Sequence, residues 1–362
     1  MLSEEKTHPD ILSMDLSELE NYLSAEFELP RFRAKQIYKW LSCGKGFDDM
    51  TNLSLELRKK LKEECFCSLV EPEQKLVSEI DGTIKYLYRL YDGNHVESVV
   101  MHYEHGTTIC ISSEVGCNMG CRFCASAIGG MTRRLLPGEM LGQVVRSIAD
   151  GNKINGIVMM GIGEPLDNYD NVIKFLKLVS SEDGVNIGAR HISLSTCGIV
   201  DKIYKLSEEM LGITLSISLH ASNDDARSSI MPINNKWKIG ELMKACKHYF
   251  LTTGRRISFE YTLISGKNDS EKDANALADL FYRTFTENGK LLPMHINLIP
   301  VNKVREREYT HGSRESIRRF ESTLSNRGIN ATVRRTLGPD INASCGQLRK
   351  KRENIIETTE LH

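Results

Sequence analysis

The 362-residue sequence lacks several features that would set it apart from ordinary enzymes. No apolar run approaches the roughly 18–20 residues of a membrane-spanning helix. The first residues, MLSEEKTHPD, are acidic and polar and do not resemble a secretory signal. Internal repeats and low-complexity segments are also missing. We therefore expect a cytoplasmic protein without a membrane segment, long enough for a full-sized enzyme core and a smaller module.

An excess of either charge is missing as well, but the charges are unevenly distributed. Lys and Arg total 47 against 48 Asp and Glu, so the net charge argues neither for nor against a polyanionic partner. Residues 1–30 carry eight acidic side chains and one lysine, whereas residues 31–62 carry nine Lys or Arg and three Asp or Glu. Such a reversal is typical of a solvated face, although a basic stripe on a small helical module also suits contacts to phosphate groups.

The spacing of apolar residues changes twice along the chain. Residues up to 66 have helical spacing, and Asp15 with Glu18 forms a capping-box pattern at the start of one helix. Residues 69–103 contain short alternating runs separated by Asp-Gly turns, which predict β-hairpins. We divide the chain into an N-terminal accessory domain (1–103), a core (104–336) and a C-terminal tail (337–362).

Strand-like and helix-like segments alternate beyond residue 103. The predicted strands are residues 107–112, 156–161, 191–195, 213–219, 257–262 and 294–299. Six β/α repeats in order predict an α/β fold with a parallel sheet, either doubly wound or a partial TIM-type barrel. In both folds ligand sites gather at the carboxyl ends of the strands, so functional residues should directly follow these segments.

Three cysteines, Cys117, Cys121 and Cys124, follow the first core strand with C-x3-C-x2-C spacing. Clustered thiols in a chain without an export signal favour a metal site over structural disulfides. A structural zinc needs a fourth protein ligand, and no second Cys pair or His pair stands at a suitable spacing. Three cysteines would instead leave one iron of a [4Fe-4S] cluster open for a further ligand. We therefore favour a [4Fe-4S] cluster, with zinc and chance spacing as the alternatives.

With Phe123 before the last cysteine, this spacing resembles the signature of the radical S-adenosylmethionine (SAM) superfamily. The resemblance implies a partial (β/α)6 TIM-type barrel. It also implies that the open iron holds SAM, which one electron from the cluster cleaves to a 5′-deoxyadenosyl radical. Cofactor-binding residues would then lie at successive strand ends, although each alone passes for a structural residue. These residues are Gly163, Glu164, Ser195, Ser218, Leu219, His220 and Asn297.

Seven motifs past residue 95 resemble those of the RlmN/Cfr family of RNA adenine methyltransferases. They are CISSEVGCNMGCRFCAS, VMMGIGEPLDN, LSTCGIV, SISLHASND, MPINNKW, INLIP and DINASCGQL. The NLIP segment and the general spacing are more similar to RlmN, which methylates the 2-position of adenine, than to Cfr, which methylates the 8-position. The resemblance implies two substrates: an adenosine in the peptidyl-transferase region of 23S rRNA, and the adenosine 3′ to the tRNA anticodon.

The family resemblance also implies roles for two cysteines outside the triplet. Cys345, in the tail, would take a methyl group from one SAM, and a second SAM would supply the radical. The methylene radical on Cys345 would add to the adenine ring, and Glu97 would accept the ring proton. Cys110 would then release the base by forming a transient disulfide with Cys345. By residue type alone Cys345 and Glu97 pass for surface or packing residues, and the basic run 349–352 would favour a Cys345 thiolate.

The expected partners are the two RNAs and an electron donor of the flavodoxin or ferredoxin type. We expect the protein itself to be a monomer. Basic segments that could contact phosphate are the helices within residues 31–62, Arg133–Arg134, Arg255–Arg256, Arg334–Arg335 and residues 349–352. Two alternatives stay open at this point. One is methylation of the adenine 8-position, and the other is a non-catalytic, metal-bound RNA-binding module.

Overall fold

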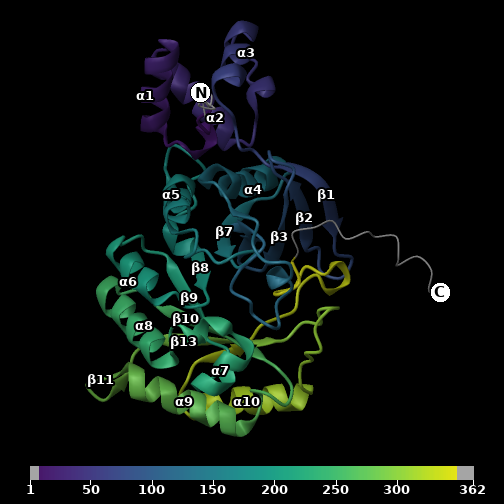
Figure 1. The fold of residues 1–362 in the computed structure, drawn as a ribbon, viewed down its shortest axis with the longest axis vertical. Helices are drawn as coiled ribbons and strands as arrows, with labels where there is room; N and C mark the ends of the chain where they lie inside the picture. Colours follow the sequence, from purple (N-terminus) through teal and green to yellow (C-terminus); the bar gives the residue numbers. More distant parts are fainter. Residues whose placement is uncertain (1–7, 349–362) are drawn as a thin grey trace, which may run out of the picture.

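A ten-stranded sheet runs through the protein, whose computed structural model describes residues 8–348 (Figure 1). In sheet order its strands are β1 (Glu71–Val77), β2 (Ile84–Arg89), β3 (His95–Tyr103), β4 (Gly106–Cys110), β7 (Ile154–Met159), β8 (Ile192–Thr196), β9 (Thr214–Ser218), β10 (Ile257–Leu263), β13 (Met294–Pro300) and β14 (Ala331–Val333). Two small ribbons lie outside this sheet, formed by β5 (Glu114–Val115) with β6 (Arg133–Arg134) and by β11 (Thr286–Glu287) with β12 (Lys290–Leu291).

Helices precede the sheet and connect its parallel strands. The N-terminal helices are α1 (Leu16–Phe27), α2 (Arg31–Ser42) and α3 (Leu55–Glu64). The core helices are α4 (Pro137–Ala149), α5 (Tyr169–Ser180), α6 (Val200–Glu208), α7 (Asp224–Ile230), α8 (Ile239–Thr253), α9 (Glu271–Phe285) and α10 (Arg314–Asn326). Among residues 8–348, none of these helices is long and apolar enough to cross a membrane.

The six predicted core strands are confirmed as β4, β7, β8, β9, β10 and β13, and every bound lies within two residues of its predicted position. They pair in parallel and in chain order, as in Ile157↔Ile192. One more parallel strand, β14, pairs with β13 through Ile296↔Ala331. Because β1 and β14 lie at the two ends of the strand order, the sheet is an open, partial barrel. The expected α/β fold is therefore confirmed.

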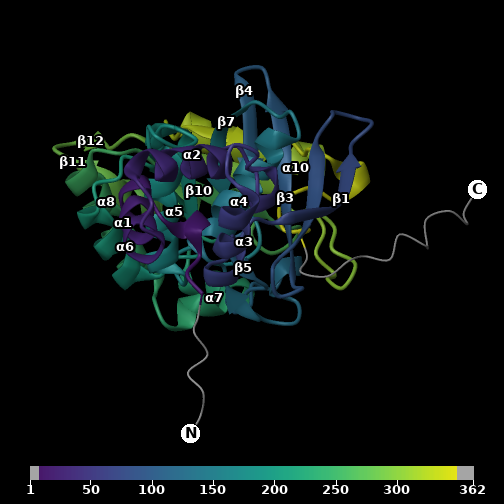
Figure 2. The ribbon, with the colours of Figure 1, turned by 90° about the horizontal axis from the view of Figure 1, so that it is seen from above.

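The hairpin strands β1, β2 and β3 extend the core sheet instead of forming a sheet of their own. They pair antiparallel with one another, and β3 pairs with β4 through Val99↔Cys110. The proposed division at residue 103 thus falls at a turn between two hydrogen-bonded neighbours. Figure 2 shows β1 on the side of the molecule away from α6 and α8.

The helices α1–α3 lie at one end of the molecule, next to α4 and α5 (Figure 1). The predicted capping box is confirmed, since the backbone N–H groups of Asp15 and Glu18 donate reciprocally to each other's carboxylates, at 2.9 Å each. Lys174 of α5 donates to Asp15 at 2.9 Å, and the backbone N–H of Gly138 in α4 donates to Ser13 Oγ at 2.8 Å. These contacts fix the helical module on the core.

Candidate functional site

The three cysteines of the C-x3-C-x2-C motif line one open cavity. The motif lies in the loop after β4, and the cavity lies at the carboxyl ends of the parallel strands, where ligands bind in such folds. Five of the residues expected to bind the cofactor line the same cavity. They are Gly163, Glu164, Ser195, Ser218 and His220. The fold therefore brings residues from three strand ends, those of β7, β8 and β9, to the cysteine loop.

The donor set and the space fit a [4Fe-4S] cluster with SAM beside it. Within residues 8–348, no three His, Cys, Asp or Glu side chains converge on a single ion. A four-iron cluster does not require such convergence, because each cysteine binds a different iron. Burial raises the pKa of Cys121 to about 12 and also raises that of Cys117. Cluster binding must therefore displace protons from these thiols.

The loop after β7 approaches the cysteine loop too closely for any side chain at Gly163. This residue has φ +110°, and an added Cβ would lie 2.7 Å from Ser113 Oγ. The next residue is Glu164, and its carboxylate accepts hydrogen bonds from the backbone N–H groups of Cys197 at 2.7 Å and Leu166 at 3.0 Å. These bonds hold the Glu164 side chain in place at the cavity wall, as the binding of an ammonium group would require.

His220 is held in one orientation at the end of β9. Its φ of +56° is unusual for a residue with a side chain, and such conformations cluster at functional sites. Its Nδ1 accepts from the backbone N–H of Thr262 at 2.9 Å, which leaves Nε2 to carry the ring proton. Burial lowers the pKa of His220 to about 3, so the ring is neutral. The ring packs edge-on against Phe123 of the cysteine loop, with centroids 5.0 Å apart.

Three other residues from the expected set do not line this cavity. Leu219 is fully buried, and the Asn297 amide donates to Glu260 Oε2 at 2.7 Å. Glu97 on β3 is buried and pairs with Lys85 at 3.1 Å. The Lys85 ammonium also donates to the carbonyl of Asn342 at 3.4 Å, so Glu97 is linked to the tail segment that precedes Cys345.

The C-terminal tail is docked between the β1–β2 turn and the cysteine loop. On one side, Asp340 accepts from Ser78 Oγ at 2.7 Å and from the backbone N–H of Glu79 at 3.0 Å. On the other side, the backbone N–H of Ala125 donates to the Gly346 carbonyl at 2.8 Å. The Asn302 amide donates to the carbonyl of Cys345 itself at 3.0 Å. Contacts on both sides therefore place Cys345 at the wall of the cavity that Cys117, Cys121 and Cys124 line, which we call the cluster cavity.

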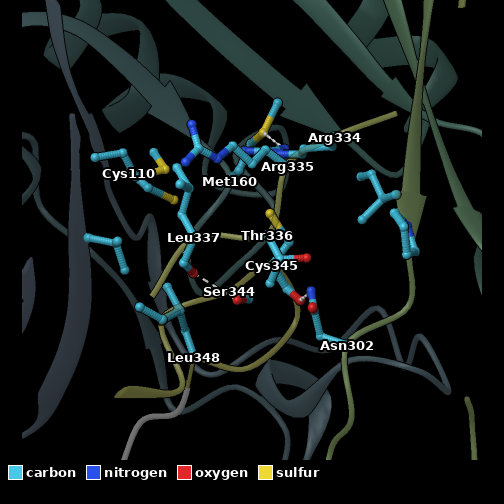
Figure 3. A pocket seen from close by; sticks show the side chains of 15 residues that line it. Cys110, Met160, Asn302, Arg334, Arg335, Thr336, Leu337, Ser344, Cys345 and Leu348 are labelled. Atoms are coloured by element: carbon cyan, nitrogen blue, oxygen red, sulfur yellow. Dashed lines mark hydrogen bonds between the residues drawn. The ribbon is translucent and has the colours of Figure 1, made fainter. Parts of the chain in front are cut away.

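Cys345 also lines a second, small cavity together with Cys110 (Figure 3). Both residues are free thiols. Burial raises the pKa of Cys110 to about 12, and the charge of Cys345 raises it further. The two cysteines thus share one cavity, although Cys110 lies near the start of the core sequence and Cys345 lies in the C-terminal tail. Cys345 belongs to both cavities, so it lies between Cys110 and the cluster cysteines.

Arg334 is the cation between these cavities, and it lines both. Its Nη1 lies 3.5 Å from the sulfur of Met160 and 4.0 Å from Glu260 Oε2. The charge of Cys345 is the main cause that raises the pKa of Arg334. The positive charge at Cys345 therefore comes from Arg334, whereas the basic run 349–352 lies outside the described residues.

Reasoning from the sequence missed several residues that line the cluster cavity. They are Met160, Glu260, Thr262, Asn302 and Arg334. Glu260 gives no distinct signal, because it stands at a polar position of the alternating strand segment 257–262, where a solvent-facing side chain is expected. Arg334 was considered only as a phosphate contact. Another arginine of that group, Arg133, forms paired 2.7 Å bonds with buried Glu139.

Comparison with known proteins adds independent findings. The Radical SAM superfamily model matches residues 111–278, and the model of the ribosomal RNA large subunit methyltransferase N-terminal domain matches residues 9–67. A protein of Alkaliphilus oremlandii named "Probable dual-specificity RNA methyltransferase RlmN" is 51% identical over 344 residues, which is 94% of this chain and 98% of that protein. A protein of the same name from Clostridium botulinum (strain Alaska E43) is 50% identical over 353 residues, 97% of this chain and 98% of that protein.

A solved structure supports the same relationship. It is a radical SAM methyltransferase from Sphaerobacter thermophilus, with a TM-score of 0.88 and 43% sequence identity. The match covers 95% of this chain and 100% of that chain. The likeness therefore includes the N-terminal helices and the extended sheet as well as the core.

Proposed function

Because this chain belongs to the RlmN family of radical SAM RNA methyltransferases, we propose that it methylates the 2-position of adenosine in 23S rRNA and in tRNA. The main observation in support is the position of Cys345. It lines the cluster cavity and shares a second cavity with Cys110. A thiol between a radical source and a second thiol suits a methyl carrier that is later released by thiol exchange.

The bound cluster supplies the electron that cleaves SAM, and Cys117, Cys121 and Cys124 would hold three of its irons. One SAM binds beside it, with Glu164 accepting from the ammonium group and Gly163, Ser195, Ser218 and His220 lining its site. Leu219 and Asn297 support this wall from behind. Two SAM molecules are used in each turnover, because the transferred methyl group and the radical come from different molecules.

The chemistry on the RNA takes place at the sulfur of Cys345. As a thiolate, this sulfur would take the methyl group of one SAM, which leaves as S-adenosylhomocysteine. A hydrogen atom of this methyl group would then pass to the 5′-deoxyadenosyl radical from the second SAM, and the carbon radical left behind would bond to the adenine ring carbon. Glu97 would accept the ring proton, and the extra electron of the adduct would return to the oxidised cluster. The Cys110 sulfur would then attack the Cys345 sulfur, which forms an S–S bond and breaks the carbon–sulfur bond, and the released carbon would take up one proton to give the methyl group on the base. Reduction of this disulfide restores both thiols.

The remaining partners follow from the same proposal. A donor of the flavodoxin or ferredoxin class delivers the electrons, and the enzyme acts as a cytoplasmic monomer. The target adenine must leave its stack to reach Cys345, which is least costly in looped or single-stranded RNA.

The methylated position is tested by mass spectrometry of the RNA product. Reconstituted protein, SAM, a reductant and an RNA fragment are incubated without oxygen, and the modified nucleoside is compared with synthetic 2-methyl- and 8-methyladenosine. We expect 2-methyladenosine from both rRNA and tRNA fragments. Formation of 8-methyladenosine would assign a Cfr-type activity, and a cluster-loaded protein that never cleaves SAM would contradict enzymatic function altogether.

A further inference from the structure

Arg227 is fully buried, although every atom to which it donates a hydrogen bond is neutral. It lies on α7, the helix that follows β9. Its Nε donates to the Leu219 carbonyl at 3.1 Å and its Nη1 to Asn234 Oδ1 at 3.2 Å. Its Nη2 donates to the carbonyls of Cys197 at 2.6 Å and Ser218 at 3.1 Å. Burial of a guanidinium without a directly bonded anion is unfavourable, which calls for a reason.

This guanidinium lies directly behind the wall of the cluster cavity. Two of its acceptors, the carbonyls of Cys197 and Ser218, belong to residues that line the cavity. The cysteine loop also contacts α7, since the backbone N–H of Arg122 donates to the Ile230 carbonyl at 2.9 Å. Arg227 and Cys121 act on each other electrostatically, and each favours the charged form of the other. The helix that carries the buried cation therefore contacts the cysteine loop directly next to Cys121.

Within residues 8–348, no ionisable side chain accepts a hydrogen bond from the Arg227 guanidinium. Burial lowers its pKa, and the groups that oppose this effect are the thiols of Cys197, Cys121 and Cys246 and the Asp224 carboxylate. Asp224 is reached only through Asn234, whose Nδ2 donates to Asp224 Oδ1 at 3.1 Å. The same Asp224 oxygen accepts from the backbone N–H of Ile239 at 2.9 Å. Asp224 therefore does not neutralise the guanidinium by direct contact.

A four-iron cluster bound by three thiolates is an anion, and one-electron reduction adds a further negative charge. The potential of such clusters depends on nearby charge, hydrogen bonds and solvent exposure. We propose that Arg227 is the fixed counter-charge of the cluster and raises its reduction potential, which makes electron uptake from the external donor easier. This inference rests on the proposed function, because that function places a cluster on Cys117, Cys121 and Cys124.

The test is a redox titration of the reconstituted, full-length protein, with the reduced cluster quantified by electron paramagnetic resonance. Arg227→Met removes the charge, and Arg227→Lys keeps it with fewer hydrogen bonds. Asn234→Asp leaves Arg227 in place and adds a carboxylate at its Nη1. Arg122→Met is the matched control, since Arg122 lies between two cluster cysteines in the sequence but is exposed, where solvent screens its charge.

We expect Arg227→Met and Asn234→Asp to lower the reduced-to-oxidised ratio at a fixed potential by about tenfold, which is 59 mV for one electron. Arg227→Lys and Arg122→Met should stay close to the wild type. Equal losses in the Met and Lys variants would show that the hydrogen bonds matter and the charge does not, which overturns the inference. If Arg227→Met does not retain a cluster, an unchanged potential in Asn234→Asp overturns it. Failure of the wild type to bind a cluster would instead contradict the proposed function.

Discussion

At the scale of single residues, the protein places several ionisable groups where water cannot reach them. Glu114 precedes the cysteine triplet and is fully buried, and its Oε2 accepts from the backbone N–H of Glu164 at 2.9 Å. Burial raises the pKa of Glu114 to about 8, and the neighbouring Asp167 carboxylate raises it further. Glu114 is therefore mostly protonated near neutral pH. Its hydrogen bond joins the segment before the cysteine loop to the loop that carries Glu164.

The raised pKa of Glu114 predicts that the Glu114→Gln variant is more stable against unfolding than the wild type, by an amount that depends on pH. Because the pKa of about 8 in the folded protein lies above the ordinary value of 4.5, the stability linked to the protonated form is present below pH 4.5 and is lost as pH rises through about 8. Glutamine keeps the acceptor for Glu164 but never ionises. We expect the variant to exceed the wild type in thermal unfolding midpoint by several degrees near pH 8.5 and by much less near pH 5. An equal difference at both pH values would contradict a buried, protonated Glu114.

Arg334 and Glu260 show which site residues the sequence alone does not reveal. Glu260 stands at a polar position of an alternating strand, so its place in the cavity wall is not apparent from the sequence. Arg334 looks like half of a basic pair, and only the fold shows that it lines both cavities beside Cys345. Arg227 gives no signal at all, because its burial depends on carbonyls of the residue after β8, the last residue of β9 and the residue that follows it.

At the scale of elements, the parallel strands were predictable and the tail was not. Each core strand is a short apolar segment next to a helical one, so local pattern alone specifies it. The docking of residues 337–348 depends instead on partners distant in the chain, from Asn302, 43 residues before Cys345, to Ser78, 262 residues before Asp340. No local pattern encodes such contacts, and only the family resemblance pointed to the role of this segment.

The tail contacts predict a specific effect for Asp340→Ala. This change removes the bonds to Ser78 Oγ and to the backbone N–H of Glu79, each worth about 1–2 kcal/mol in such settings. We expect roughly tenfold slower RNA methylation, because Cys345 is no longer held at the cavity wall, and faster proteolysis within residues 337–348. The melting temperature of the core should change little. Glu182→Ala, at an exposed carboxylate on the core, is the matched control and should alter neither property.

At the scale of the whole molecule, the basic helix α2 lies at the end opposite α9 and α10 (Figure 1). Lys35 and Lys39 are exposed on α2, and Arg33 is half-buried and bonded to Gln36 at 2.9 Å. Their charge is therefore available to an RNA that reaches from this helical module toward the cavity. The model of the ribosomal RNA large subunit methyltransferase N-terminal domain matches this module, at residues 9–67.

Charge reversal of Arg33, Lys35 and Lys39 together should weaken RNA binding in a salt-dependent way. Loss of these phosphate contacts should reduce the slope of log affinity against log salt by about 2. Reversal of three basic residues at the other end, Lys272, Arg283 and Lys290, is the matched control. Equal affinities and slopes for the two triple variants, measured by filter binding at several salt concentrations, would remove α2 from the RNA interface.

The central claim is that Cys345 carries the methyl group to RNA and that Cys110 releases the product, and one measurement tests it most directly. Reconstituted wild-type, Cys110→Ala, Cys345→Ala and Cys43→Ala proteins are incubated anaerobically with SAM, reductant and labelled RNA, and covalent protein–RNA adducts are separated on denaturing gels. Cys43 is exposed at the end of α2 and serves as the control. We predict that the adduct accumulates only in Cys110→Ala, that Cys345→Ala forms neither adduct nor methylated RNA, and that Cys43→Ala behaves like the wild type. Continued turnover without an adduct in Cys110→Ala, or methylation by Cys345→Ala, would contradict the claim.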